Sequence, residues 1–476
     1  MMTHSLCTAD NKTITIDQES IDTFKAGLRG SLVTPESPEY DTARTIWNAM
    51  VDKRPGMIIR CAGTADVIHA VNFANEHNLL VAVKGAGHNI AGNAMCDGGL
   101  VIDLSPMKSV RVDPVKRIAW VEPGATLRDM DHETQAFGLA TPLGINSTTG
   151  VSGLTLGGGF GWLTRKYGAT VDNLIGADMI TAEGKMVHAS ANENTDLFWG
   201  IRGGGGNFGV VTTFEFKLHP VGPEIFAGLI VFPFDQAKSA LAQYREFAKT
   251  LREEANTWVV LRKAPPLPFL PETIHGKEVI VFPNFLAGSE ADGKNITDKV
   301  KKFGTPAGEH LGMMPYTGWQ QAFDPLLTPG ARNYWKSHNF AELTDELIDV
   351  VLDAASNLPS PHCEIFIGML GAAYSRVAED ATAYTHRDAN FVINVHARWE
   401  TPQEDNANIA WARDFFDRAA PFATGGVYVN FMTEEETDRV QGGAYKSDVL
   451  ARLTEVKNKW DPRNFFRMNQ NIRPSV

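Results

Sequence analysis

Three bursts of glycine between short apolar segments constrain the fold of this chain more than any other feature. They lie at residues 85–92, 150–161 and 203–209. Clustered glycines let backbone amides approach a ligand closely, as in loops that bind phosphate groups. The third burst contains a Gly-x-Gly-x-x-Gly pattern, but a strand-like segment follows it, which excludes the dinucleotide fingerprint. We therefore expect an extended phosphate-bearing ligand bound in another way; a turn-rich domain without such a ligand is the alternative.

The composition disfavours several classes of function. The formal net charge is −12 over 476 residues, and no cluster of lysine and arginine offers a surface to nucleic acid or an anionic membrane. No apolar run approaches the ~20 residues of a membrane-spanning helix, and residues 1–12 lack the apolar stretch of a signal peptide. The four cysteines are scattered and the histidines lack metal-ligand spacing. We expect a cytoplasmic protein with no metal site and no disulfide framework.

The order of apolar segments predicts an α+β fold with more than one packed unit. Short strands are expected at 57–60, 79–84, 100–104, 118–121 and 210–218, and helices from Thr64 and at 126–137. Longer alternating strands, typical of an antiparallel sheet, follow at 225–232, 278–285, 364–369 and 391–399. Helices are expected between them and in the tail, at 236–251, 343–355, 406–419 and 446–460. The predicted segments are 1–53, 54–220, 221–430 and 431–476.

A series of motifs resembles that of one enzyme family. In order they are Gly-x-Gly-His at 85–88, Leu-x-Ile-Asp-Leu at 100–104, Val-x-Pro-Gly-Ala at 121–125, Leu-Gly-Gly-Gly-Phe-Gly at 156–161, Asp172-Asn173, Gly-Asn-Phe-Gly-Val-Val at 206–211, and a tail with Tyr428-Val429-Asn430-Phe431 and Asn469-Gln470-Asn471-Ile472. Residues 54–220 are similar to the PCMH-type FAD-binding domain of the vanillyl-alcohol oxidase superfamily. The tail resembles the berberine-bridge-enzyme C-terminal element. The resemblance implies a two-domain fold, in which 221–430 form an antiparallel-sheet substrate domain and 431–476 return to the FAD domain.

The resemblance also implies how FAD is held. His88 matches the histidine that forms an 8α-histidyl bond to the flavin. Many relatives form a second bond through a cysteine, but Asn146 occupies that position here, so we expect a single covalent link. Val151 stands at the family's oxygen-access position, where valine resembles oxidases. The other residues expected to contact FAD are Lys84, Gly85, Ala86, Gly87, Asn89, Ile90, Gly150, Gly153, Gly158, Gly161, Asp172, Asn173, Asn207, Val211, Asn469 and Asn471.

The catalytic group is expected in the substrate domain. Side chains two apart on a strand share a face, which places Tyr428 beside Asn430 and His396 beside Asn394. We expect Tyr428 to act as base or proton relay, with Glu364 or His396 as its partner and Asn430 nearby. The alternative for these polar residues is a hydrogen-bonded structural role.

The function implied by the resemblance is that of an FAD-dependent oxidase. It would take hydride from a small organic substrate, an alcohol, amine or lactol, and pass the electrons to O2, giving H2O2. Apolar residues near the candidate base favour an aromatic or secondary-metabolite substrate over a free sugar. The alternatives are a flavin-N5-oxide-type oxygenase of secondary metabolism, a dehydrogenase with a non-oxygen acceptor, and a flavin carrier without catalysis.

Overall fold

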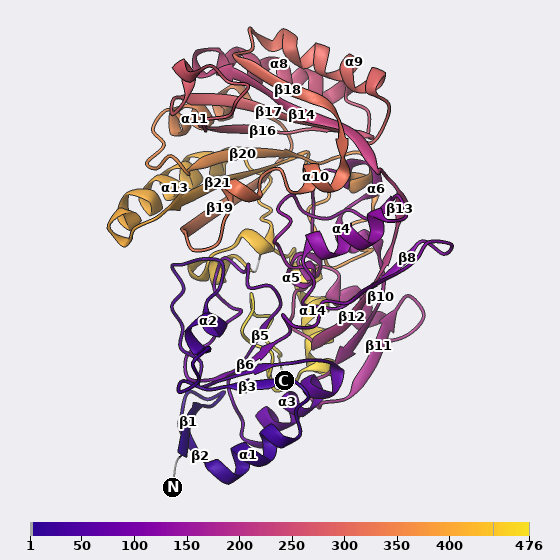
Figure 1. Cartoon of the computed structure of the whole chain (residues 1–476), viewed down its shortest axis with the longest axis vertical. Helices are drawn as coiled ribbons and strands as arrows, with labels where there is room; N and C mark the ends of the chain where they lie inside the picture. The colour runs from indigo at the N-terminus through magenta and orange to yellow at the C-terminus, as the bar shows by residue number, and fades with distance from the viewer. Residues whose placement is uncertain (1–2, 441, 476) are drawn as a thin grey trace.

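The computed structural model describes residues 3–440 and 442–475 and shows two regions stacked along the long axis of the molecule (Figure 1). The first region contains both mixed and antiparallel sheets, and the second is built on one large antiparallel sheet. The α+β class predicted from the sequence is confirmed. Most predicted strands and helices lie close to their expected ranges.

A four-stranded sheet in the first region leads directly to the first glycine burst. Its order is β3 (Ser31–Val33), β4 (Met57–Arg60), β6 (Leu100–Asp103) and β5 (Val81–Lys84). Strands β4, β6 and β5 run parallel, because helix α3 (Thr64–Glu76) forms the crossover from β4 to β5. Beside this sheet lie β1 (Thr3–Cys7), β2 (Thr13–Asp17), α1 (Gln18–Ala26) and α2 (Tyr40–Arg44). The loop that holds His88 begins where β5 ends.

The other two glycine bursts lie in connections of a five-stranded antiparallel sheet. Its order is β11 (Met186–Ser190), β10 (Leu174–Ile180), β12 (Val210–Lys217), β8 (Ile118–Val121) and β7 (Val110–Asp113). The burst at 150–161 lies between β8 and β10, and that at 203–209 lies directly before β12. Helix α4 (Leu127–Gln135) starts at a capping box, in which Thr126 and Asp129 satisfy each other's backbone amides. The remaining elements here are β9 (Leu139–Ala140), α5 (Val151–Leu156), α6 (Thr164–Tyr167), α7 (Thr195–Ile201) and β13 (His219–Pro220).

The second region is a sheet with helices on its outer face (Figure 1). The strand order is β18 (Gly308–Pro315), β14 (Glu224–Pro233), β17 (Glu278–Leu286), β16 (Val259–Lys263), β20 (Glu364–Met369), β21 (Phe391–Trp399) and β19 (Arg332–Phe340), and β15 (Ala255–Thr257) pairs with β17. The main helices are α8 (Ala237–Thr250), α9 (Glu290–Val300), α11 (Asp345–Ala355) and α13 (Asp405–Ala419), with α10 (Tyr316–Gln320) and α12 (Ala373–Arg376) in connections. Residues such as Ile280, Ile365 and Ile393 pack under the helices, so the alternate residues face the first region.

The C-terminal segment returns to the first region. Helix α14 (Ser447–Trp460), drawn in yellow in Figure 1, packs against α7. Its buried Lys457 donates from Nζ to the backbone oxygen of Asn207 at 2.7 Å and to Asp461 at 2.7 Å. Among the described residues, no helix combines the length and apolar character needed to cross a membrane.

Candidate functional site

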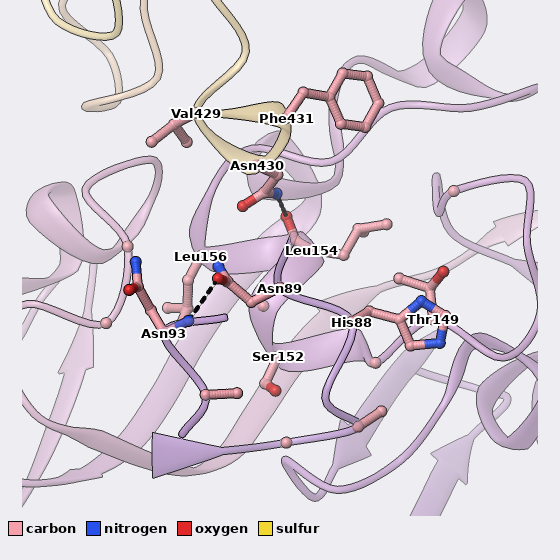
Figure 2. A pocket seen from close by; sticks show the side chains of 18 of the residues that line it. His88, Asn89, Asn93, Thr149, Ser152, Leu154, Leu156, Val429, Asn430 and Phe431 are labelled. Atoms are coloured by element: carbon pink, nitrogen blue, oxygen red, sulfur yellow. Dashed lines mark hydrogen bonds between the residues drawn. The ribbon is translucent and has the colours of Figure 1, made fainter. Parts of the chain in front are cut away.

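A cavity of about 300 Å³ lies between the glycine loops of the first region and the inner face of the large sheet. Figure 2 shows the side chains of one part of its wall, with His88 and Asn89 from the loop after β5, Ser152 and Leu154 from α5, and Asn430 from the tail. All three glycine bursts contribute to the wall. Segments far apart in the sequence therefore meet at a single site.

His88 is held as a neutral imidazole in this wall. The ring of Trp47 stacks on it at 5.2 Å, and burial lowers the pKa of His88 to about 4. Thr148 Oγ1 lies 3.3 Å from His88 Nε2 and donates its own proton to Asn146 Oδ1 at 2.8 Å. The Thr148 oxygen is therefore an acceptor for an Nε2–H, which leaves a lone pair on Nδ1. Asn146 thus orients the histidine through Thr148.

Small residues let the His88 loop contact the start of α5. A Cβ atom on Gly150 would lie 2.8 Å from Ala86 Cβ and 3.1 Å from its backbone nitrogen. Gly87 adopts a φ of +75°, which favours glycine. These close approaches explain why both loops need glycine where they meet.

Tyr428 also lines the cavity, and two hydrogen bonds hold its hydroxyl. Its Oη accepts hydrogen bonds from the Gly159 amide at 3.1 Å and from Asn430 Nδ2 at 2.9 Å. Burial raises the pKa of Tyr428 well above its usual value, although these two donors oppose the rise. Both donors would stabilise a phenolate, and the Tyr428 proton remains available to a ligand.

The strand predicted around Tyr428 and Asn430 is wrong. Residues Val429–Phe431 form a short 3₁₀ turn that starts directly after Tyr428. The turn still brings the two side chains into contact, because Asn430 Nδ2 donates to Tyr428 Oη. Asn430 Nδ2 also reaches the backbone oxygen of Leu154, 3.2 Å away (Figure 2).

An ionised carboxylate lies on the inner face of the sheet. Glu364 Oε2 accepts from Arg262 Nη1 at 2.8 Å, and Glu364 Oε1 lies 3.4 Å from His396 Nδ1. Burial acts to raise the pKa of Glu364, but Arg262 and then His396 lower it below its ordinary value. The pKa of His396 is lowered by burial, although Glu364 opposes this. At neutral pH the pair is therefore Glu364 carboxylate and neutral His396.

Aromatic rings close the space between these groups. The ring of Phe431 meets those of Tyr428 at 4.8 Å, Trp335 at 5.4 Å and Phe366 at 6.0 Å, edge to face. Asn394 on β21 is 1% exposed and lines the cavity, and neither of its amide atoms has a hydrogen-bond partner among the described residues. A buried amide of this kind can satisfy both atoms on a polar ligand.

The structure brings many predicted site residues to this cavity. They are Glu364, His396, Tyr428 and Asn430, together with Gly85, Ala86, Gly87, His88, Asn89, Gly150, Gly153, Asn207, Val211 and Asn469. Within the described part of the chain, the predicted residues that lie outside its wall are Lys84, Ile90, Val151, Gly158, Gly161, Asp172, Asn173 and Asn471.

Several of these outside residues have other partners. Lys84 donates from Nζ to the backbone oxygen of Ala43 at 2.9 Å. Asp172 receives two hydrogen bonds from Arg387, at 2.7 and 2.8 Å, and both side chains are buried. Asn173 donates to the backbone oxygens of Tyr167 and Ala169 and accepts from His219, so its side chain stabilises the fold. Across residues 3–440 and 442–475, no cluster of three or more His, Cys, Asp or Glu could hold a metal ion.

The sequence analysis missed the contribution of the N-terminal segment. Trp47 lines the cavity, and Asn48 donates to the backbone oxygens of Ile90 at 3.2 Å and Asn333 at 3.0 Å. The backbone N–H of Asn333 donates in return to Asn48 Oδ1 at 3.0 Å. This exchange ties the His88 loop to β19. Trp47 and Asn48 belong to no local sequence motif, so only their three-dimensional contacts identify them as part of the site.

Comparisons with known proteins agree with this arrangement. Residues 55–190 match the family described as FAD binding domain, and residues 427–473 match the family described as berberine and berberine like. An FAD-linked oxidoreductase of Dictyostelium discoideum is 32% identical over 95% of this chain and 97% of its own length. (R)-6-hydroxynicotine oxidase of Paenarthrobacter nicotinovorans is 29% identical over 94% and 97%. The crystal structure of 6-hydroxy-D-nicotine oxidase from Arthrobacter nicotinovorans has a TM-score of 0.83 at 27% identity, covering 94% of this chain and 98% of that one.

Proposed function

Because the chain belongs to the berberine-bridge-enzyme-like family of FAD-linked oxidoreductases, we propose that it is an oxidase with one covalent flavin link, through His88. In this proposal a small organic substrate with an oxidisable alcohol, amine or lactol group binds between the flavin and the large sheet. The observation that carries the proposal is a buried, neutral His88 in the same cavity as Tyr428 and the Glu364 carboxylate.

The residues around the cavity fit FAD. The glycines that line it, among them Gly85, Gly153 and Gly205, leave backbone accessible to an extended ligand, and a Cβ on Gly153 would meet no atom within 4 Å. His88 Nδ1 carries the lone pair that bond formation at the flavin 8α carbon requires. Asn146 replaces the cysteine of doubly linked relatives, which supports a single bond.

The side chains opposite the glycine wall would position and deprotonate the substrate. When bound, FAD supplies the hydride acceptor and the site at which dioxygen is reduced to hydrogen peroxide. Tyr428 Oη would exchange a proton with the substrate, since its two N–H donors stabilise the phenolate. Glu364 would hold the substrate or act as base beside His396. Asn394 would bind a polar group of the substrate through its unpartnered amide.

The residue at the family's oxygen-access position is the basis for proposing dioxygen as the electron acceptor. Val151 is buried at the first turn of α5, directly after Gly150, which lines the cavity. Its small side chain supports dioxygen as acceptor, as in the oxidases that the sequence resembles.

Mass spectrometry of the denatured protein tests the link. We expect the mass of one FAD on the parent peptide that contains His88 and none on a His88→Ala variant, with a Trp411→Phe variant on the outer helix α13 labelled like the parent. A peroxide-coupled screen of alcohols, amines and lactols then tests the reaction. Release of all colour from the acid-precipitated parent would contradict the covalent link. Incorporation of labelled dioxygen into the product would show that the enzyme is an oxygenase. Reoxidation of the reduced flavin by a dye but not by air would show that it is a dehydrogenase.

A further inference from the structure

A second cavity, of about 70 Å³, continues the first along the inner face of the large sheet. The two cavities share the side chains of Ile145, Trp258, Leu327, Glu364 and Phe366. The rings of Trp258 and Phe366 stack at 5.8 Å and mark the boundary. The second cavity therefore opens beside the carboxylate and extends away from His88, which lines only the first.

Strand register explains how the face divides. Opposite residues on neighbouring strands share a face, and Glu364 lies opposite both His396 on β21 and Arg262 on β16. Toward β21 the face carries Asn394 and His396. Toward β17 and β14 it carries Val260, Val281 and Val231, with Leu267 and Leu270 of the proline-rich loop above. The sheet is therefore polar over β20 and β21 and apolar over β16, β17 and β14.

The second cavity offers a ligand only apolar contact. Its wall is almost entirely hydrocarbon, and its two charged residues, Arg262 and Glu364, are paired with each other at 2.8 Å. Protein interiors close voids of this kind, because unfilled apolar space forfeits packing contacts. An apolar void that joins a polar reaction site is explained by a ligand group that fills it.

We infer that the second cavity is the specificity subsite for an apolar arm of the substrate. This inference rests on the proposed function and narrows its substrate class. The substrate is an amphiphilic molecule, with its oxidisable alcohol or amine between Tyr428 and Glu364 and an alkyl or aryl substituent beyond Phe366, against Val260 and Val281. A free sugar, which has hydroxyl groups on every side, would leave polar atoms unpaired there.

A series of 4-n-alkylbenzyl alcohols, from methyl to hexyl, tests this with the purified protein kept reduced and free of oxygen, so that no alcohol is oxidised during the titration. Calorimetric titration should show Kd falling roughly fourfold for each added methylene, with an increasingly negative heat-capacity change. In Val260→Phe the fall should stop after the first members, so that the hexyl compound binds at least about tenfold more weakly than to the parent. Val260→Ala should preserve the chain-length dependence, and the same change at the half-buried Val350 on α11, Val350→Phe, should match the parent.

Two kinds of failure are distinguishable in this experiment. A Kd that is independent of chain length, an unchanged series in a folded Val260→Phe, or absence of binding by the hexyl compound would overturn the subsite. Calorimetry needs no flavin signal, so a protein that binds the series but carries no flavin would refute the proposed function and leave the subsite standing. If Val260→Phe does not fold, loss of chain-length dependence in Val260→Ala decides against the inference.

Discussion

The two walls of the main cavity are built by different means. The wall around His88 is made of loops whose close packing depends on missing side chains, as at Gly150 against Ala86. The opposite wall consists of side chains on strands and on the turn after Tyr428, and its charges are fixed by partners such as Arg262. In the proposed function, the first wall shapes the space for the cofactor, and the second holds the groups that act on the substrate. Changes in the two walls should therefore have separable effects.

Tyr428→Phe should give the largest effect and change chemistry alone. It removes the oxygen that accepts from both Asn430 Nδ2 and the Gly159 amide, and with it the proposed proton carrier. We expect the rate constant of flavin reduction to fall by roughly 10²–10⁴-fold, with flavin content unchanged, measured by stopped-flow under anaerobic conditions. Tyr244→Phe, at a buried tyrosine on helix α8, is the matched control. If the flavin of the Tyr428→Phe protein were reduced at the parental rate, Tyr428 would have no part in the mechanism.

Arg262→Met should destabilise the substrate wall by about 3–5 kcal/mol at pH 7.5, because it leaves the Glu364 carboxylate buried without its Arg262 partner. In the parent, the lowered pKa of Glu364 stabilises the fold above the ordinary carboxyl pKa, and this contribution disappears as pH falls through the lowered value. In the variant, burial raises the pKa of Glu364, so the deficit should shrink on acidification toward pH 5. Urea unfolding at both pH values measures this.

The double variant Arg262→Met with Glu364→Gln is the control for charge. It should recover much of the loss at pH 7.5, since no unpaired carboxylate remains. Loss of the exposed Lys249–Glu246 pair by Lys249→Met should have no such pH dependence. A deficit in Arg262→Met that is identical at the two pH values would show that packing, and not charge, explains the contact.

The difference between the two walls also explains which features could be predicted from the sequence. The glycine bursts and the tail motif are local patterns, so the α+β class and many cavity residues were predicted. Strand β19 was not predicted, because Asn333, Trp335 and Ser337 give its inner face no apolar alternation. The pairing of Glu364 with Arg262 depends on the register of β16 and β20, which are separated by about a hundred residues. Lys84 and Asp172 matched family motifs, yet their partners lie outside the cavity.

Gly150→Ala should impair the cofactor wall and leave the substrate wall intact. Its Cβ would lie 2.8 Å from that of Ala86, which forces the His88 loop away from α5. We expect a clear loss of bound flavin after expression, measured by the ratio of flavin to protein absorbance, with the flavin that remains still reduced at the parental rate. Gly312→Ala on β18, where a Cβ meets no atom within 4 Å, should retain parental flavin content. A fully loaded Gly150→Ala protein with a lower reduction rate would break the proposed division between the walls.

Trp47→Phe should have the smallest effect and test a side chain that contacts both walls. Trp47 stacks on His88, meets Trp335 edge to face at 5.5 Å, and donates from Nε1 to the backbone oxygen of Leu327 at 3.0 Å. Phenylalanine keeps a ring on His88 but loses that hydrogen bond, so the free energy of unfolding should fall by about 1 kcal/mol. Trp411→Phe loses an equivalent hydrogen bond to Ala354 on the outer helices and should cost a similar amount. The flavin absorption spectrum should shift only in Trp47→Phe, because only that ring touches the imidazole; identical spectra in both variants would mean that Trp47 supports the fold without orienting His88.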